Sequence, residues 1–233
     1  MKYLFVVLFT FGMGNSLFGQ SEFNLADYDE RLLHYGFQIG VQMANFKVEH
    51  SRHFAINGDS TIAVNPEVSP GFSVGFILDA AIDEEYWNVR LNPNVAFYTN
   101  NVTFHYRPDV ADDAPTVFTE SVETAFFQLP ILLKYKSLRR GNHRVYLVGG
   151  IVPSMKIGGK KLALDETRLA TQDFNFEITY GAGLDLYMSF FKFSPEVRFS
   201  HGIGNMVNRN GSSFERNIER MTTHRFSILL NFE

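Results

Sequence analysis

The stretch that decides the fold is Thr222-Thr223-His224-Arg225-Phe226-Ser227-Ile228-Leu229-Leu230-Asn231-Phe232-Glu233. One face carries His224, Phe226, Ile228, Leu230 and Phe232, and the other carries Thr223, Arg225, Ser227, Leu229 and Asn231. Apolar residues that recur at every second position are typical of a β-strand, because successive side chains of a strand point to opposite faces. A soluble sandwich would bury the apolar face in its core, whereas a transmembrane barrel would turn it to lipid and direct Arg225 into a wet interior.

The same alternation recurs along the chain and predicts eight strands. Their ranges are 35–44, 71–80, 87–98 with an extension to 106, 127–135, 144–151, 174–188, 193–200 and 222–233. Pro93 removes one ladder hydrogen bond from the third strand, so we expect a bulge or weak pairing there. Extending the fourth strand backward places Glu123 on the apolar face, so either the membrane boundary lies near it or a bulge shifts the register.

The predicted connections alternate in length. Those after the first, third, fifth and seventh strands run to about ten to twenty residues, and the others to about three to seven, which is the asymmetry of an outer-membrane barrel. Aromatic residues near the strand ends at the tight turns, Tyr35, Trp87 and Tyr135, suit an interfacial girdle. We therefore predict an all-β protein, an eight-stranded antiparallel transmembrane β-barrel of the outer-membrane type. A soluble lipocalin-like barrel is the alternative, but its outer face would carry more charge than the Asn, Gln, Ser and Gly found here.

Composition narrows the function classes. The 233 residues carry a formal charge of −4, which gives no electrostatic reason to expect nucleic acid as a partner. The chain has no cysteine, which excludes disulfides, thiolate zinc sites, thiol catalysis and a lipid-modified N-terminal cysteine. No Pro/Gly/Ser-rich linker or charge block divides the barrel region, so we expect a single domain there.

The N-terminus reads as an export signal. Residues 1–20 combine Lys2, an apolar run over 3–11 and a smaller, more polar stretch over 12–19, which predicts a signal peptide cleaved near Gly19 or Gln20. An uncleaved anchor is the alternative, although the apolar run is shorter than the roughly 20 residues a spanning helix needs. Residues 21–33 are then an N-terminal periplasmic arm, either exposed or a short helix, and residues 34–233 form the barrel.

The predicted polar faces carry four acidic and four basic residues. They are Asp79, Arg90, Lys134, Glu177, Asp185, Glu196, Arg198 and Arg225. An eight-stranded barrel is just wide enough inside for side chains, so unpaired charges there would cost several kcal/mol each. We predict a structural charge network in the lumen, with Arg225 paired to a carboxylate such as Asp185 or Glu196; a proton or ion relay is the alternative.

No constellation for catalysis, cofactor binding or metal binding is predicted. Of the seven histidines, His201 and His224 lie on facing strand ends at the loop side, where they can meet, but no nucleophile is placed beside them. The pair His50 and His53 lacks defined further metal ligands.

Several segments carry a resemblance to a known group. They are His34–Phe37, Pro70–Gly75, Phe127–Tyr135 and Tyr180–Asp185, which resemble small outer-membrane β-barrel proteins of Bacteroidetes-type bacteria. Within that group, about residues 30–233 are similar to the PorT family, linked to type IX secretion and gliding motility. The chain length, the arm, Asp185 and the run Pro195–Arg198 favour this narrower family.

The resemblance implies a non-enzymatic outer-membrane component required for protein transport. Its expected partners are outer-membrane lipid and other envelope or secretion-system proteins, with no cofactor, nucleic acid or small-molecule substrate. Two alternatives stay open: a small surface barrel for adhesion or envelope stability, and a narrow, porin-like ion pore.

Overall fold

The computed structural model describes residues 23–50, 61–66, 68–83, 85–106, 117–159, 173–204 and 218–233. The predicted signal peptide, residues 1–20, and large parts of the four predicted long connections lie outside these ranges. The elements are η1 (Ala26–Tyr28), β1 (Leu33–His50), β2 (Thr61–Pro66), β3 (Ser69–Ala81), β4 (Trp87–Leu91), β5 (Asn94–Tyr106), β6 (Val117–Gln128), β7 (Ile131–Lys136), β8 (His143–Gly159), β9 (Phe174–Tyr187), β10 (Lys192–Gly202) and β11 (Ile218–Phe232). Within the described ranges, no helix has the length and apolar character needed to cross a bilayer.

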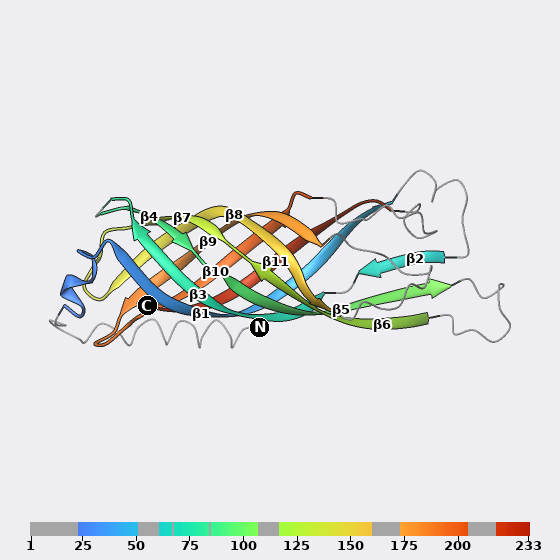
Figure 1. The fold of residues 1–233 in the computed structure, drawn as a ribbon, viewed down its shortest axis with the longest axis horizontal. Helices are drawn as coiled ribbons and strands as arrows, with labels where there is room; N and C mark the ends of the chain where they lie inside the picture. The colour runs from blue at the N-terminus through green and yellow to red at the C-terminus, as the bar shows by residue number, and fades with distance from the viewer. Residues whose placement is uncertain are drawn as a thin grey trace, which may run out of the picture.

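The strands form one antiparallel sheet that closes on itself (Figure 1). Around the ring, β1 is followed by β3, then β4 with β5, β6 with β7, β8, β9, β10 and β11. The last strand returns to the first, with Phe232 opposite Phe37 and Thr222 opposite Lys47. The predicted eight-stranded barrel is confirmed, and its ring has no free edge.

Two of the eight ring positions are each occupied by two shorter strands because a proline interrupts them. Pro93 separates β4 from β5, as expected for a residue that cannot donate to the ladder. Pro130 separates β6 from β7 in the same way, so the prediction of a continuous strand over 127–135 is wrong. The two breaks lie side by side, since the backbone N–H of Asn92 donates to the carbonyl of Pro130 at 3.0 Å.

The strands extend further at the loop end than the sequence predicts. The long connection after the first strand contains β2, which pairs with the outer part of β5, and β8 runs to Gly159 rather than ending at 151. Among the described residues, the part of β6 that precedes Thr124 pairs only with β5, so β2, β5 and β6 continue past the ring as a separate ribbon (Figure 1). The register of β6 against β8 shifts between Ala125 and Phe126, close to the predicted irregularity at Glu123.

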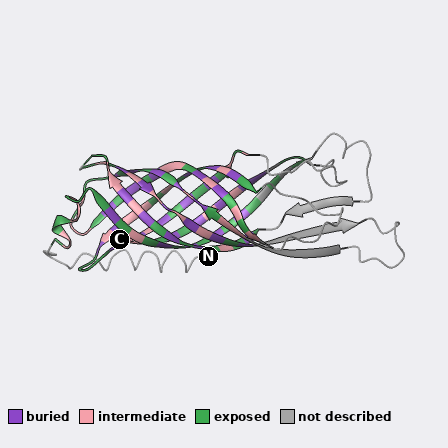
Figure 2. Cartoon of the chain, in the orientation of Figure 1, coloured by how far each residue is buried: buried purple, intermediate pink, exposed green. Residues whose placement is uncertain are grey.

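Burial alternates along the ring strands (Figure 2), but in the opposite sense to a soluble protein. Large apolar side chains face outward and are exposed, as with Phe76 at 73%, whereas charged side chains face inward, as with Arg90 at 0%. This inversion is what a barrel in lipid requires, because hydrocarbon covers its outside. The lipocalin-like alternative, which would bury the apolar face, is therefore wrong. At the turn end, Trp87 packs against Tyr135 with ring centroids 4.8 Å apart.

Candidate functional site: the barrel interior

The interior of the ring is filled by polar and charged side chains. The structure places all eight sequence-predicted charges there, namely Asp79, Arg90, Lys134, Glu177, Asp185, Glu196, Arg198 and Arg225, and none is more than 6% exposed. They come from β3, β4, β7, β9, β10 and β11, and each projects inward because it follows the inward parity of its strand.

Arg90 is the centre of the largest group of ion pairs. Its guanidinium lies 2.6 Å from the carboxylate of Asp79, 2.8 Å from that of Glu233 and 3.6 Å from that of Glu196. Asn88 donates a further hydrogen bond to Asp79. Three carboxylates, from β3, from β10 and from the residue just after β11, thus converge on one fully buried cation.

Lys134 and Asp185 form a second buried pair, at 2.9 Å. The hydroxyl of Ser194 also donates to Asp185, at 2.7 Å. The ammonium of Lys134 lies 3.9 Å from the centre of the Tyr146 ring, whose hydroxyl donates to Glu196 at 2.9 Å. Tyr146 therefore links the second pair to the group around Arg90.

Glycine at position 183 gives Tyr146 its space. A Cβ atom at Gly183 would clash with the Tyr146 ring, so the small residue on this strand and the large one opposite are complementary.

Two further arginines, Arg198 and Arg225, lie nearer the loop end than the group around Arg90. Arg198 donates to Glu196 at 2.8 Å, and Arg225 pairs with Glu177 and also donates to the hydroxyl of Tyr98 at 2.5 Å. Arg225 therefore has a carboxylate partner as predicted, but the partner is Glu177 rather than Asp185 or Glu196.

Strand register explains the actual partner of Arg225. Arg225 lies opposite Ser200, and Ser200 lies opposite Thr179, which is only two residues from Glu177. Glu196 lies opposite Leu229, four residues away from Arg225 along β11. Arg225 is thus level with the loop-side carboxylate and out of reach of the turn-side ones.

Five further residues of the interior at the turn end were not predicted from the sequence. They are Tyr28, Lys192 and Glu233, which join the group around Arg90, and Asp29 and Arg144, which pair with each other. The alternation of the strands indicates an inward position for three of them, because Arg144, Lys192 and Glu233 each lie on the inward face of a predicted strand or of its direct extension. The strand predicted over 193–200 begins one residue too late to include Lys192, which is the first residue of β10.

The N-terminal arm closes the turn end of the barrel. The hydroxyl of Tyr28 accepts from Lys192 at 2.9 Å and donates to Glu233 at 3.1 Å, while its ring stacks on His34 with centroids 4.1 Å apart. Burial raises the pKa of Tyr28, so its phenol keeps the proton that it donates to Glu233. Of the two expectations for the arm, a short helix is present at Ala26–Tyr28.

Asp29 provides the second anchor of the arm. Arg144 donates to both of its carboxylate oxygens at 3.0 Å, a bidentate contact, and Tyr187 donates at 3.2 Å. Earlier in the arm, the side chain of Asn24 donates to the carbonyl of Tyr187 at 3.0 Å. The arm is therefore joined to the interior of the barrel through Tyr28 and Asp29, and these two side chains are partly buried rather than freely exposed.

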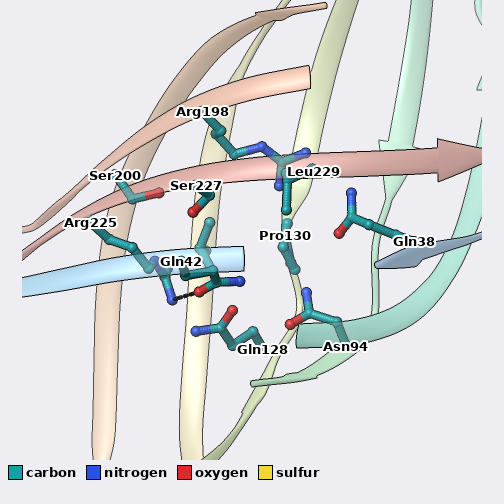
Figure 3. A pocket seen from close by; sticks show the side chains of 11 residues that line it. Gln38, Gln42, Asn94, Gln128, Pro130, Arg198, Ser200, Arg225, Ser227 and Leu229 are labelled. Atoms are coloured by element: carbon teal, nitrogen blue, oxygen red, sulfur yellow. Dashed lines mark hydrogen bonds between the residues drawn. The ribbon is translucent and has the colours of Figure 1, made fainter. Parts of the chain in front are cut away.

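A small polar cavity remains in the loop-side half (Figure 3). Its walls include the amides of Gln38, Gln42 and Gln128 and the guanidinium groups of Arg198 and Arg225. With about 10 Å³, it has room for about one water molecule. Across the part of the chain that is described, no three His, Asp or Glu side chains gather to hold a metal ion.

The sequence of the barrel matches that of a known family over most of its length. Residues 18–208 match the family described as "Outer membrane protein beta-barrel domain". The chain belongs to this family. Together with the lipid-facing apolar exterior, this assignment places the β-barrel in the outer membrane. No curated protein sequence matches the chain.

Solved outer-membrane barrels are similar to this member of the family in fold. OprG from Pseudomonas aeruginosa is 12% identical, with 84% of this chain and 93% of OprG covered and a TM-score of 0.48. Neisserial surface protein A is 10% identical, with 85% and 97% covered and a TM-score of 0.44. Ail, the attachment invasion locus protein of Yersinia pestis, is 11% identical, with 85% and 96% covered and a TM-score of 0.36.

Proposed function

We propose that this outer-membrane barrel is a component or accessory factor of type IX protein secretion that acts through protein–protein contacts. The observation that supports this function best is the closed interior. The Arg90 group fills the turn-side half, and the arm covers its mouth through Tyr28 and Asp29. A barrel filled in this way offers no passage for a protein, so a role in export has to be exercised from its surface. The resemblance to the PorT family supports the choice of secretion system.

The turn end presents a surface suited to such contacts. Each of the three tight turns carries a large exposed apolar side chain: Ile82 after β3, Leu138 after β7 and Phe190 after β9, with Phe190 93% exposed. Leu32, the arm residue that immediately precedes β1, is also exposed at this end. Short turns of outer-membrane barrels lie on the periplasmic side, so we propose that these tips contact a periplasmic or membrane-bound partner protein.

A deletion strain tests the role in secretion. We expect cargo proteins to accumulate in the periplasm when the gene is deleted, measured by immunoblotting of periplasmic and culture fractions. Normal secretion in the deletion strain would refute the proposal.

Complementation then tests the contact surface. The combined variant Ile82→Ser, Leu138→Ser and Phe190→Ser should fold, as judged by heat-dependent gel mobility, yet fail to restore secretion. The matched control is Ile203→Ser, which removes an exposed apolar side chain just after β10 at the opposite end of the barrel and should restore secretion fully. Secretion by the triple variant at the wild-type level would exclude the turn tips as the contact surface.

A second candidate function is adhesion or envelope stability at the cell surface. The ribbon formed by β2, β5 and β6 favours it, because these strands continue past the ring at the loop end, which faces outward in this class of barrel (Figure 1). A deletion strain that loses attachment while secreting normally would favour this function. The filled interior favours neither an ion pore nor catalysis, and we expect the purified barrel to be electrically silent in planar bilayers.

A further inference from the structure

On three neighbouring strands, the outward-facing side chains change from apolar to polar at the same level near the loop end. On β1, β11 and β10 the outward residues are uniformly apolar from the turn end up to Met43, Phe226 and Phe199. The next outward residues are Asn45, His224 and His201, and they lie opposite one another in a single row of the sheet. The hydrocarbon layer therefore ends between these two rows.

The two histidines of this row are in contact. The Nδ1 atoms of His201 and His224 are 2.8 Å apart, so one ring donates and the other accepts. This contact confirms the prediction that the two residues meet. The hydroxyl of Tyr180 on β9 lies 3.1 Å from Nε2 of His201, and the two rings are stacked with centroids 5.6 Å apart.

Lys47 adds a permanent positive charge beside the histidines. It lies two residues beyond Asn45 on the same outward face and is diagonal to His224, since its register partner is Thr222. Its side chain is 63% exposed, and its ion pair with Glu49 at 3.5 Å is exposed as well and therefore weak. We call Lys47, Tyr180, His201 and His224 the rim cluster.

We propose that the rim cluster binds a phosphate group of lipid A in the outer leaflet of the membrane. The cluster faces sideways into the membrane rather than into the lumen or toward the loops, and it lies just past the hydrocarbon at the extracellular end. This is the depth at which a lipid phosphate sits. Lys47 supplies charge-assisted hydrogen bonds to its oxygens, and the N–H groups of the histidine rings and the hydroxyl of Tyr180 supply further donors.

Charge attraction is stronger at this depth than in bulk water because the neighbouring hydrocarbon lowers the effective dielectric constant. The oxygens of a phosphate group accept hydrogen bonds, so the donors of the rim cluster would favour it over an uncharged group. Aromatic and histidine residues that merely belong to an interfacial girdle would show no such preference for phosphate. The two interpretations therefore differ in a measurable way.

The first experiment uses the wild-type barrel in detergent micelles and native mass spectrometry. We expect one molecule of bisphosphorylated lipid A to be retained, and retention to fall about tenfold or more for the same lipid A after enzymatic dephosphorylation. Equal retention of both lipids would overturn the proposal. Displacement of lipid A by millimolar inorganic phosphate alone would also overturn it, because the site would then select a free anion rather than a lipid.

The second experiment removes the cluster. The variant Lys47→Gln, His201→Gln and His224→Gln should lose about tenfold in apparent affinity for bisphosphorylated lipid A. The matched control, Arg31→Gln with Arg140→Gln, removes exposed basic residues at the turn end and should retain the lipid as the wild type does. Equal retention by the cluster variant and the control would overturn the proposal. If the cluster variant fails to fold, the comparison of phosphorylated and dephosphorylated lipid A on the wild-type barrel still tests the proposal.

Discussion

Replacing Arg90 by methionine should destabilise the barrel more than any other single charge removal. Arg90 is fully buried and is the shared partner of Asp79, Glu233 and Glu196. Removing one member of a buried ion pair costs about 3–5 kcal/mol, because the remaining charge stays buried without compensation. Lys192 still neutralises Glu233 at 2.8 Å, whereas Asp79 loses its cation, so we expect a loss of about 4 kcal/mol.

The single tryptophan of the chain provides the assay. Trp87 lies on the outer face of β4 at the turn end, so its fluorescence should report the move from the membrane interface to water when urea unfolds the barrel in phospholipid vesicles. The exposed control Arg140→Met should change the free energy of unfolding by less than about 0.5 kcal/mol. Adding Asp79→Asn to Arg90→Met should recover roughly half of the loss, since it removes the unpaired carboxylate. If Arg90→Met unfolds at the wild-type urea concentration, the interior charges are screened by water and the reasoning is wrong.

Three further predictions address other parts of the structure. Arg198→Ala leaves Glu196 short of one of its buried cations and should cost about 3 kcal/mol in the same urea titration; an unchanged transition would mean that this pair faces bulk water. Asp29→Asn removes the charge that anchors the arm, so limited proteolysis should cut residues 21–32 faster than in the wild type, while the barrel fragment stays intact. Gly150→Ala introduces a Cβ that clashes with the backbone of β7 and should cost about 1–3 kcal/mol, whereas the neighbouring Gly149→Ala, whose nearest atom would be 4.0 Å away, should be nearly neutral; equal effects would refute the close approach of β7 and β8.

Much of the fold could be predicted from local alternation alone. The period of two recurs in every ring strand, because each strand has one face toward lipid and one toward the interior. The same periodicity placed Arg90 and Lys134 on inward faces without any knowledge of their neighbours. The interruptions of the strands were harder to predict. Pro93 and Pro130 both lie within alternating stretches, and only Pro93 was expected to disturb strand pairing.

The partners of the interior charges could not be predicted in the same way. Arg225 pairs with Glu177 because the registers of β9, β10 and β11 bring those two residues to one level. A strand pattern specifies which way a side chain points but says nothing about how far its strand is shifted against the next. The arm shows the same limit, because its polar composition reads as solvent-exposed until Arg144 and Lys192 are seen to line the mouth where it docks.

The sequence by itself determined which residues face lipid and which face inward, how many strands cross the membrane and which end carries the tight turns. These properties follow from periodicity and connection length, which are local. The tertiary structure alone decided that Glu233 and Asp29 complete the interior network, that the arm closes the barrel and that His201 and His224 meet beside Lys47. Each of these depends on closing the sheet with a particular stagger between strands, which brings together residues that lie far apart in the chain.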